Sequence, residues 1–299
     1  VQSNTICQAW QKAFGIEPAT MGIVLTVLTL LIIFGGIQRV AKFSSTVVPV
    51  MAVVYLLIAV GVVIWNITSL PKVLLAIVEN AFGFNQAAGG VLGVTVIQGI
   101  KRGLFSNEAG EGSAPNAAAV ATVSHPVKQG LIQALGVFTD TLVVCSCTAF
   151  IILVSGVDVT ASNGIQLTQD ALTHEIGSIG NPFVAVMICL FAFSSIIGNY
   201  YYGETNVRYI RDSKLGVFIY RLAVAAMVML GAVVSLDFAW SFADITMALL
   251  TLCNLVAIVL LSHQAVFLLQ DYRQQKKEGK NPVFCKDKMP EIADKLEAW

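Results

Sequence analysis

The sequence predicts an all-α protein that crosses a membrane several times as a polytopic helical bundle. Of its 299 residues, 56% are hydrophobic and only 12% are Asp, Glu, Lys or Arg, which is about half of the charged share of an ordinary soluble domain. The mean hydropathy is +0.77, and several apolar runs reach the roughly 20 residues that a helix needs to cross a bilayer. A soluble fold has no interior large enough for so much apolar surface.

Six predominantly apolar segments predict spanning helices. They cover residues 20–37, 46–67, 130–157, 182–198 with its continuation, 216–236 and 242–269. The last of them is long enough to span the bilayer even when it is tilted. A further segment, between the second and the third, has a different pattern.

Residues 89–123 begin as an apolar run, are interrupted at Lys101, Arg102 and Gly103, and continue as a run of small residues. The segment is too long for one straight span and fits two half-helices that meet near the middle of the membrane. Because glycine adopts backbone angles that unwind a helix, the sequence predicts one broken helix, with its non-helical part from Gly103 to Asn107. The alternative is an amphipathic cytoplasmic loop in which Lys101 and Arg102 are interfacial anchors.

The distribution of basic residues predicts how the chain is oriented in the membrane. With the broken segment counted as one of about seven crossings, one side receives Arg39, Lys42, Lys128, Arg208, Arg211, Lys214 and the basic residues of the tail. The opposite loops contain only Lys12 and Lys72. We therefore expect an extracytoplasmic polar segment (1–19), a transmembrane domain (20–270) and a cytoplasmic tail (271–299), in a multi-pass protein of the plasma (inner) membrane.

The start of the chain has no initiator Met and lacks the basic region and short apolar core of a signal peptide. We interpret Val1 as an internal start, and we expect the chain to be the C-terminal portion of a longer protein. The six cysteines are scattered without a CxxC pair, and the three histidines are far apart in sequence. The sequence therefore predicts neither a disulfide framework nor a zinc site.

The predicted break contains groups that could bind a zwitterion. Lys101, Arg102, Glu108 and Glu111 lie inside this membrane segment, where ionisable residues normally face a polar cavity or pair with one another. The N-terminus of a half-helix that starts near Asn107 would offer partial positive charge to a carboxylate. Unwound carbonyl groups would bind an ammonium group or Na⁺. A free amino acid needs both kinds of group.

A second polar cluster lies inside the predicted span that starts at residue 182. Ser194 and Ser195 have two interpretations: their hydroxyls bond back to a carbonyl one turn earlier, or they supply oxygen ligands to a hard cation. The sequence leaves both open. Asp140 and Asn254 are single polar residues inside spans, and for each we expect an interhelical hydrogen bond rather than a role in an ion pathway.

Two motifs in these clusters resemble a known family. GLFSNEAGEGSAPNAAA, residues 103–119, is similar to the signature of the alanine/glycine:cation symporters, and FAFSSIIGNYYYGE, residues 191–204, resembles a second block of the same family. The resemblance extends from about residue 20 to about residue 270. It implies part of a five-plus-five inverted-repeat sodium symporter-like fold, in which this chain would hold the last two helices of the first repeat and all of the second.

The resemblance also implies positions for the ligands. The amino-acid site would be lined by five residues: Gly103, Phe105, Ser106, Asn107 and Asn199. At the last of these positions many members of the family have Trp. Ser194 and Ser195 match hydroxyl positions on the eighth helix that bind Na⁺ in the broader architecture. The first broken helix of that architecture, which supplies half of both sites, is not in this sequence, so we do not expect the chain alone to transport.

From the resemblance we expect a secondary transporter that carries a small neutral amino acid, alanine or glycine, by symport with a cation. Na⁺ is the expected ion, and H⁺ is the alternative that the sequence leaves open. We expect a surrounding of membrane lipid, no cofactor beyond the coupling ion, no enzymatic activity and no nucleic-acid partner. A passive channel or pore subunit is the alternative, but it predicts rings of like charge or repeated carbonyl filters, and the sequence contains neither. A membrane-embedded enzyme would need catalytic groups inside the spans, whereas His125 and His174 lie in loops and His263 lies near a helix end.

Overall fold

A computed structural model confirms the all-α polytopic membrane protein. The structure describes residues 1–35, 37–81, 89–293 and 296, and every regular element within these ranges is a helix. Five helices in this part of the chain are long and apolar enough to cross a membrane: Ser45–Trp65, Pro126–Ser155, Ile165–Ile210, Lys214–Val233 and Leu236–Lys277. The first predicted span corresponds to a shorter apolar helix, Pro18–Ile33.

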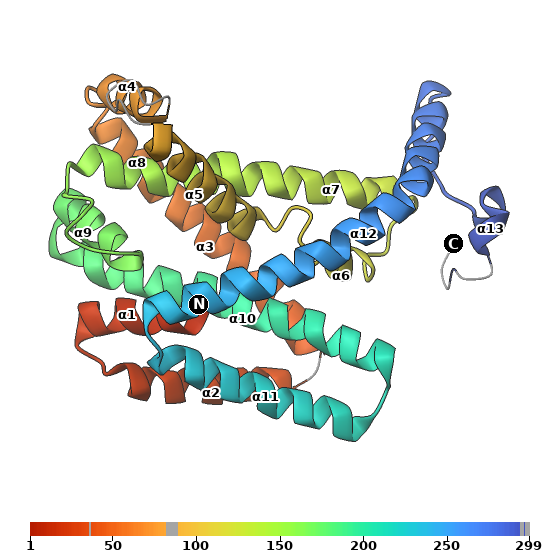
Figure 1. The fold of residues 1–299 in the computed structure, drawn as a ribbon, viewed down its shortest axis with the longest axis horizontal. Helices are drawn as coiled ribbons and strands as arrows, with labels where there is room; N and C mark the ends of the chain where they lie inside the picture. Colours follow the sequence, from red (N-terminus) through yellow and green to blue (C-terminus); the bar gives the residue numbers. More distant parts are fainter. Residues whose placement is uncertain (36, 82–88, 294–295, 297–299) are drawn as a thin grey trace. The chain divides into compact units, whose positions relative to one another are not determined.

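The chain divides into two compact units, and unit 1 consists of Val1–Gly103 and Leu142–Ile245. Its complete helices are α1 (Gln2–Phe14), α2 (Pro18–Ile33), α3 (Ile37–Trp65), α4 (Leu70–Ala81), α8 (Ser146–Ser155), α9 (Ile165–Ile176), the 3₁₀ helix η2 (Gly177–Ile179), α10 (Gly180–Ile210) and α11 (Lys214–Val233). The longest of these, α10, packs against α1, α2, α3, α9 and α11. It is therefore the central helix of unit 1 (Figure 1).

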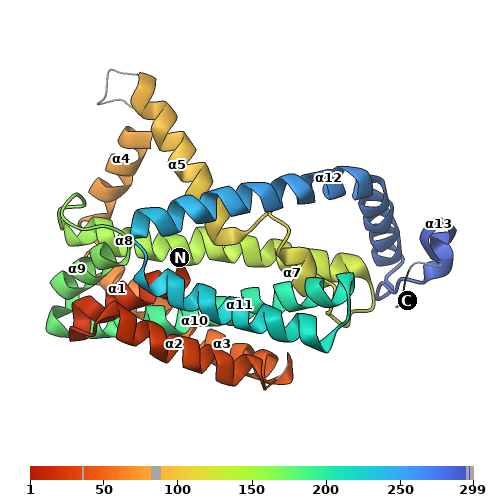
Figure 2. The same cartoon turned by 60° about the horizontal axis from the view of Figure 1, so that its bottom comes forward.

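One side of α10 packs against α1, α2 and α11. Ile6 of α1, Leu25 of α2 and Ile197 of α10 are fully buried in this cluster, and Val228 of α11 is almost fully buried. Figures 1 and 2 show α1 beside α10 and α2 beside α11. These close contacts stabilise this half of the unit, because membrane helices associate mainly through van der Waals packing of their side chains.

The first helix, α1, lies within residues 1–19, for which the sequence predicts only a polar segment. The helix is amphipathic: Ile6 and Cys7 are fully buried, while its opposite face is polar. The Asn4 amide nitrogen also donates hydrogen bonds to the carbonyl oxygens of Gly231 (3.2 Å) and Val234 (2.7 Å) at the end of α11. A short amphipathic helix has too few apolar residues to stand out in a scan for membrane-length runs.

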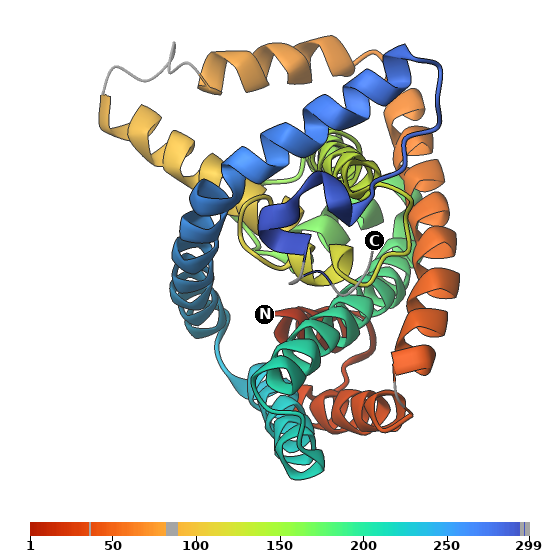
Figure 3. The same cartoon turned by 90° about the vertical axis from the view of Figure 1, so that its right-hand side faces the viewer.

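The other side of α10 packs against α3 and α9, and both of these helices also pack against α8. Tyr55 and Ala59 of α3, Ile151 of α8, Leu172 of α9 and Met187 of α10 belong to this second cluster. Figure 3 shows α3 as one long orange helix. With apolar side chains on two sides, α10 shows no single apolar stripe, as expected for a helix at the centre of a bundle.

Unit 2 consists of Leu104–Thr141 and Thr246–Trp299. It contains the end of α5 (Gly89–Asn107), the short helix α6 (Ala114–Ala118), α7 (Pro126–Thr139), most of α12 (Leu236–Lys277), the 3₁₀ helix η3 (Lys286–Lys288) and α13 (Pro290–Ala293). A π-helical segment, η1 (Asp140–Cys145), directly follows α7. Segments of this kind inside membrane-length helices are frequent at functional sites.

The C-terminal tail folds back onto the start of α7. The backbone N–H of Phe284 donates to the Ser124 carbonyl oxygen (2.8 Å), and the Ser124 hydroxyl donates to the Pro282 carbonyl oxygen (3.0 Å). Phe284 is almost fully buried and Pro282 is fully buried. Residues 294–295 and 297–299 of the predicted tail lie outside the described part of the chain.

The imidazole of His125 joins this tail contact to α7 and α12. Its Nδ1 atom accepts a hydrogen bond from the Val127 backbone N–H (3.2 Å) and so caps α7, which fixes Nε2 as the protonated nitrogen of the neutral ring. Nε2 then donates to the Asp271 carboxylate (3.2 Å), and Lys288 of the tail pairs with the same carboxylate (2.6 Å). The ring is fully buried and lies edge-on against Phe284.

Candidate functional site

The membrane segment that follows α4 is broken, but not where the sequence predicted. Helix α5 continues through Gly103 to Asn107, so the non-helical stretch predicted from Gly103 to Asn107 is wrong. The chain leaves the helix at Glu108 and becomes helical again only at Ala114. Figure 1 shows this interruption between α5 and α6.

The position of the break follows from backbone angles after Asn107. Glu108 has a φ of 54°, Gly110 of 81° and Gly112 of 112°, and such positive values end a right-handed helix. A single glycine within a helix costs only about 1 kcal/mol, so the residues around Gly103 keep it helical. The two later glycines, and not Gly103, therefore unwind the helix.

Contacts from α6 and α12 hold the broken segment in place. The Asn254 amide nitrogen of α12 donates to the Gly110 carbonyl oxygen (2.9 Å), and the Asn116 amide nitrogen donates to the Gly112 carbonyl oxygen (3.0 Å). A Cβ atom at Gly112 would lie 3.0 Å from the Asn254 Cβ atom. Asn254 therefore forms a structural hydrogen bond, as expected, but its acceptor is the unwound backbone between α5 and α6 and not another helix.

The predicted ligand residues of α5 form its last turn, and two of them contact the start of η1. The Ser106 hydroxyl donates to the Asp140 carboxylate (2.5 Å), and the Asn107 amide nitrogen donates to the Thr141 hydroxyl (2.9 Å). Phe105 is partly buried. The interhelical hydrogen bond expected for Asp140 is therefore confirmed, and unit 2 brings these polar side chains together.

The helix end at Asn107 has the opposite polarity to the one expected. Asn107 is the last residue of α5, and the C-terminal end of a helix presents carbonyl oxygens with partial negative charge. This end favours an ammonium group or a metal cation rather than a carboxylate. The Asn107 side-chain oxygen accepts the backbone N–H of Ala109 (2.9 Å), so it also stabilises the first turn of the break.

Two carboxylic acids lie within the break itself. The Ser113 hydroxyl donates to the Glu108 carboxylate, and the backbone N–H of Glu111 donates to the Glu108 carbonyl oxygen (3.2 Å). Glu111 is only 6% exposed. Both are among the ionisable residues of this membrane segment, and the sequence predicts no specific role for either.

Ser194, Ser195 and Asn199 belong to α10 in unit 1. Both serine hydroxyls donate to the Phe191 carbonyl oxygen, at 2.8 Å from Ser194 and 3.2 Å from Ser195, which is the back-bonded arrangement that the sequence left open. Asn199 is exposed on the same helix, and α10 is unbroken along its whole length. A role for the two hydroxyls as cation ligands therefore stays a prediction.

Sequence reasoning missed an ion network at the C-terminal part of α10. The Glu204 carboxylate pairs with Arg208 one turn later (2.6 Å) and with Arg221 of α11 (3.4 Å). The Arg221 Nε–H also donates to the Tyr200 hydroxyl (2.9 Å). A charged residue within the predicted span 216–236 was the signal that could have identified this network.

A second missed pair lies between α5 and the first part of α12 within unit 1. The Arg102 guanidinium donates to both carboxylate oxygens of Asp244, at 3.3 Å and 3.5 Å, and lies over the Trp240 ring at 4.0 Å from its centroid. Lys101 pairs with the same carboxylate at 3.8 Å. Lys101 and Arg102 therefore pair with a carboxylate on α12, outside the segment 89–123 that contains them.

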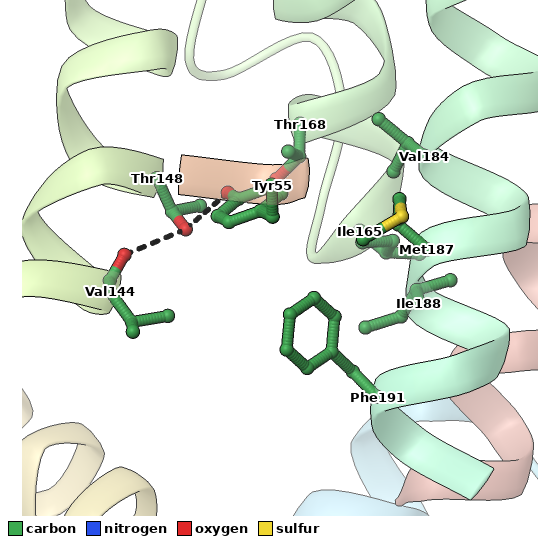
Figure 4. Close-up of a pocket in the computed structure, with 9 residues that line it drawn as sticks. All are labelled: Tyr55, Val144, Thr148, Ile165, Thr168, Val184, Met187, Ile188 and Phe191. Atoms are coloured by element: carbon green, nitrogen blue, oxygen red, sulfur yellow. Dashed lines mark hydrogen bonds between the residues drawn. The ribbon is translucent and has the colours of Figure 1, made fainter. Parts of the chain in front are cut away.

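A pocket of about 200 Å³ lies in unit 1 between α3, η1, α8, α9 and α10. Figure 4 shows the Tyr55 and Thr148 hydroxyls bonded to each other (2.6 Å) among apolar side chains that include Met187 and Phe191. The hydroxyl groups are already engaged, and no charged side chain is among the described residues that line the pocket. Because a zwitterion needs partners for both charges, we do not assign the amino-acid site to this pocket.

Comparison with known proteins identifies the family of the chain. The sodium:alanine symporter family matches residues 1–286, which extends further toward both ends than the resemblance over residues 20–270. The chain is 54% identical over 288 residues to the probable sodium/glutamine symporter GlnT of Bacillus subtilis (strain 168), covering 96% of this chain and 60% of that protein.

Two further relatives give the same result. The chain is 52% identical over 299 residues to the amino-acid carrier protein AlsT of the same organism, covering 100% of this chain and 64% of that protein. It is 38% identical over 302 residues to the sodium/proton-dependent alanine carrier protein of Bacillus sp. (strain PS3), covering 95% and 68%. The chain thus spans less than two thirds of the length of GlnT and AlsT. It belongs to the sodium:alanine symporter family.

Proposed function

We propose that the chain acts in a secondary transporter that moves a small neutral amino acid across the membrane by symport with a cation. The observation that carries this proposal is the interruption between Asn107 and Ala114, with polar side chains gathered around it. Interrupted membrane helices supply backbone binding groups at membrane depth. Family membership and the names of the three relatives, which are all symporters or carriers, support the proposal.

The proposed substrate is alanine or glycine, bound at Gly103, Phe105, Ser106 and Asn107 with a contribution from Asn199. The carbonyl end of α5 favours binding of the ammonium group of the amino acid at Asn107. One relative is named for glutamine and another for alanine, so glutamine is the competing substrate that a test has to include.

The proposed coupling ion is Na⁺, with Ser194 and Ser195 supplying hydroxyl ligands on α10. Hard cations prefer oxygen ligands of this kind. The relative from Bacillus sp. (strain PS3) is named as sodium/proton-dependent, so a proton is the competing ion. We also propose that the C-terminal tail is cytoplasmic, as the distribution of basic residues favours.

The test is uptake by the complete gene product, purified and reconstituted into lipid vesicles. We expect labelled alanine or glycine to accumulate above the outside concentration when Na⁺ is higher outside, and not when an ionophore has collapsed the gradient. Labelled glutamine, added to parallel vesicles, should accumulate less. Uptake that only equilibrates, with or without a gradient, would indicate a passive pore and would contradict symport.

A further inference from the structure

Three polar side chains meet where α9 joins α10. Gln169 and Thr173 lie on one face of α9, since residues four apart in a helix are neighbours, and Asn181 is the second residue of α10. The Gln169 Oε1, Thr173 Oγ1 and Asn181 Oδ1 atoms are buried, and none of them has a hydrogen-bond partner among the described residues. Buried polar atoms without a partner are rare in proteins, so three of them at one junction call for an explanation.

The backbone brings these side chains close together. Gly180 lies so near Thr173 that a Cβ atom on the glycine would be 2.5 Å from the Thr173 backbone nitrogen. The Gln169 Nε2 donates to the carbonyl oxygens of Ala9 on α1 (3.0 Å) and Asn181 on α10 (3.3 Å). These two bonds fix which end of the fully buried Gln169 amide is the nitrogen. Its oxygen is therefore left at the junction without a donor.

The three atoms match the hydrogen-bonding capacity of one water molecule. The two amide oxygens can only accept hydrogen bonds, whereas the Thr173 hydroxyl can donate one. A water molecule has two hydrogens to donate and lone pairs that accept, and buried waters typically make about three hydrogen bonds. One water that donates to Gln169 and Asn181 and accepts from Thr173 satisfies all three groups.

The charges around the junction favour water over a metal cation. The Lys12 ammonium group already binds α9, at the Asp170 carboxylate (2.5 Å) and the Gln166 carbonyl oxygen (3.0 Å), so it would repel a second cation. The other carboxylate of α9, on Glu175, accepts a hydrogen bond from the Asn66 amide nitrogen. Burial of an ion without a partner of opposite charge is strongly unfavourable. Hard metal cations also take about six oxygen ligands, which is more than the three neutral oxygens provide.

We propose that Gln169, Thr173 and Asn181 form a binding site for one water molecule where α9 meets α10. Gln169 then joins α9 to α1 through its nitrogen, and to α10 through both its nitrogen and the bound water. The water is part of the fold, because loss of any one of its partners leaves the others less well satisfied. The site does not depend on the proposed symport.

The experiment is Thr173→Val in the complete purified gene product, a change that replaces the hydroxyl by a methyl group. If the hydroxyl binds water, its removal leaves the water short of a partner, and the melting temperature should fall by roughly 2–4 °C. If the hydroxyl has no partner, the change removes an unsatisfied buried group and should raise the melting temperature. A rise overturns the proposal.

Thr26→Val is the matched control for this change. Thr26 is a half-buried threonine of α2 whose hydroxyl donates to the Gly22 carbonyl oxygen of its own helix (2.8 Å). Because such a bond contributes little to the stability of a helix, the melting temperature should change less than in Thr173→Val. An equal fall in the two variants would show no effect that is specific to the junction, and it overturns the proposal.

A second substitution tests whether the same water joins two of the residues. In the double variant Thr173→Val with Asn181→Ala, the two losses should be less than additive, because either change alone already disturbs the shared water. Additive losses overturn the proposal. The loss in Thr173→Val should also be equal in Na⁺ and in K⁺ salts. A loss that occurs only in Na⁺ would assign the site to a metal ion and would exclude water as the ligand.

A density map of the wild type, at a resolution that shows ordered water, covers the case in which the variants do not fold. One peak should lie within about 3.2 Å of the Gln169, Thr173 and Asn181 side-chain oxygens. A map that shows ordered water elsewhere in the protein but no peak between these three oxygens overturns the proposal.

Discussion

The arrangement of Ser194 and Ser195 on α10 is compatible with two hypotheses, hydrogen bonding within the helix and binding of a cation. Both hydroxyls donate to the Phe191 carbonyl oxygen, an arrangement that satisfies them inside a helix whether or not a cation ever binds. A hydroxyl oxygen that donates its hydrogen still has lone pairs for a metal ion. The contact is therefore compatible with a Na⁺ site and does not require one.

Replacing Ser194 and Ser195 together by Ala separates these hypotheses. If the hydroxyls bind Na⁺, the Na⁺ concentration for half-maximal uptake should rise, and the apparent amino-acid affinity should fall at low Na⁺ and recover at high Na⁺, since coupling is reciprocal. Uptake in vesicles across a Na⁺ series measures both. Ser262→Ala, which removes an equally back-bonded serine of α12, is the control and should keep the wild-type curve. An unchanged curve in the double variant as well would show that the cation site lies elsewhere.

Gly112 is the residue on which the position of the break depends most directly. Its φ of 112° is a conformation in which a side chain costs about 1–3 kcal/mol, and a Cβ atom would also press on Asn254. Gly112→Ala should therefore lower the thermal stability of the purified protein. Gly99→Ala is the control, because Gly99 lies inside α5 with open space at its Cβ position, and this change should be neutral or slightly stabilising. Equal melting temperatures for the two variants would contradict the positive φ at Gly112.

At the scale of whole elements, the spans were predictable and the exceptions have physical causes. Membrane-length helices need long apolar runs, and such runs gave α3, α10, α11 and α12 to within a few residues or a turn or two. The break could be predicted to exist because Lys101 and Arg102 interrupt an apolar run. The position of the break could not be predicted. Whether the helix ends at Gly103 or at Gly110 and Gly112 depends on contacts with α12, which is far along the chain.

Two other elements escaped prediction for a related reason. Helix α1 is short and only half apolar, so its burial depends on the helices it meets. The tail segment around Phe284 is rich in polar residues, and its docking depends on His125, which the sequence placed in an unremarkable loop. In each case the deciding contact is between residues distant in sequence, which local patterns do not encode.

The His125 contact predicts a measurable link between α7 and the tail. His125→Ala removes the cap of α7, which typically costs about 1 kcal/mol, and leaves Asp271 with fewer partners. We expect a lower melting temperature and faster cleavage of the tail near Arg273 by trypsin. His263→Ala, which changes an exposed histidine of α12, is the control and should leave both unchanged. A tail that stays equally resistant in His125→Ala would contradict the docked arrangement.

For the whole molecule, the composition and the helices agree on a membrane protein. The most apolar stretch of α12 has no buried residue in the described structure, and helices that are apolar all round are found in contact with lipid or with other membrane helices. Whole-molecule class was therefore predictable from composition alone. The orientation in the membrane and the identity of the ligand could not be predicted from composition, because the number of apolar residues is the same for either orientation and for any ligand.

The proposed orientation predicts which face of the membrane each loop reaches. Cys285 of the tail is exposed, and Asn163, in the loop between α8 and α9, is exposed as well. A membrane-impermeant maleimide should label Asn163→Cys in intact cells but should label Cys285 only in inverted vesicles. Cys285→Ser is the control for the second signal. Labelling of Cys285 from outside intact cells would reverse the topology.

The docking of the tail on the start of α7 also bears on how the chain is made. Ser124 and Pro282 are 158 residues apart, and ribosomes add roughly 5–20 residues per second, so several seconds pass between the synthesis of the two partners. During that time α7 has been delivered to the bilayer while His125 still lacks Asp271 and Phe284. The start of α7 therefore lacks its contacts with the tail until the last part of the polypeptide has been translated.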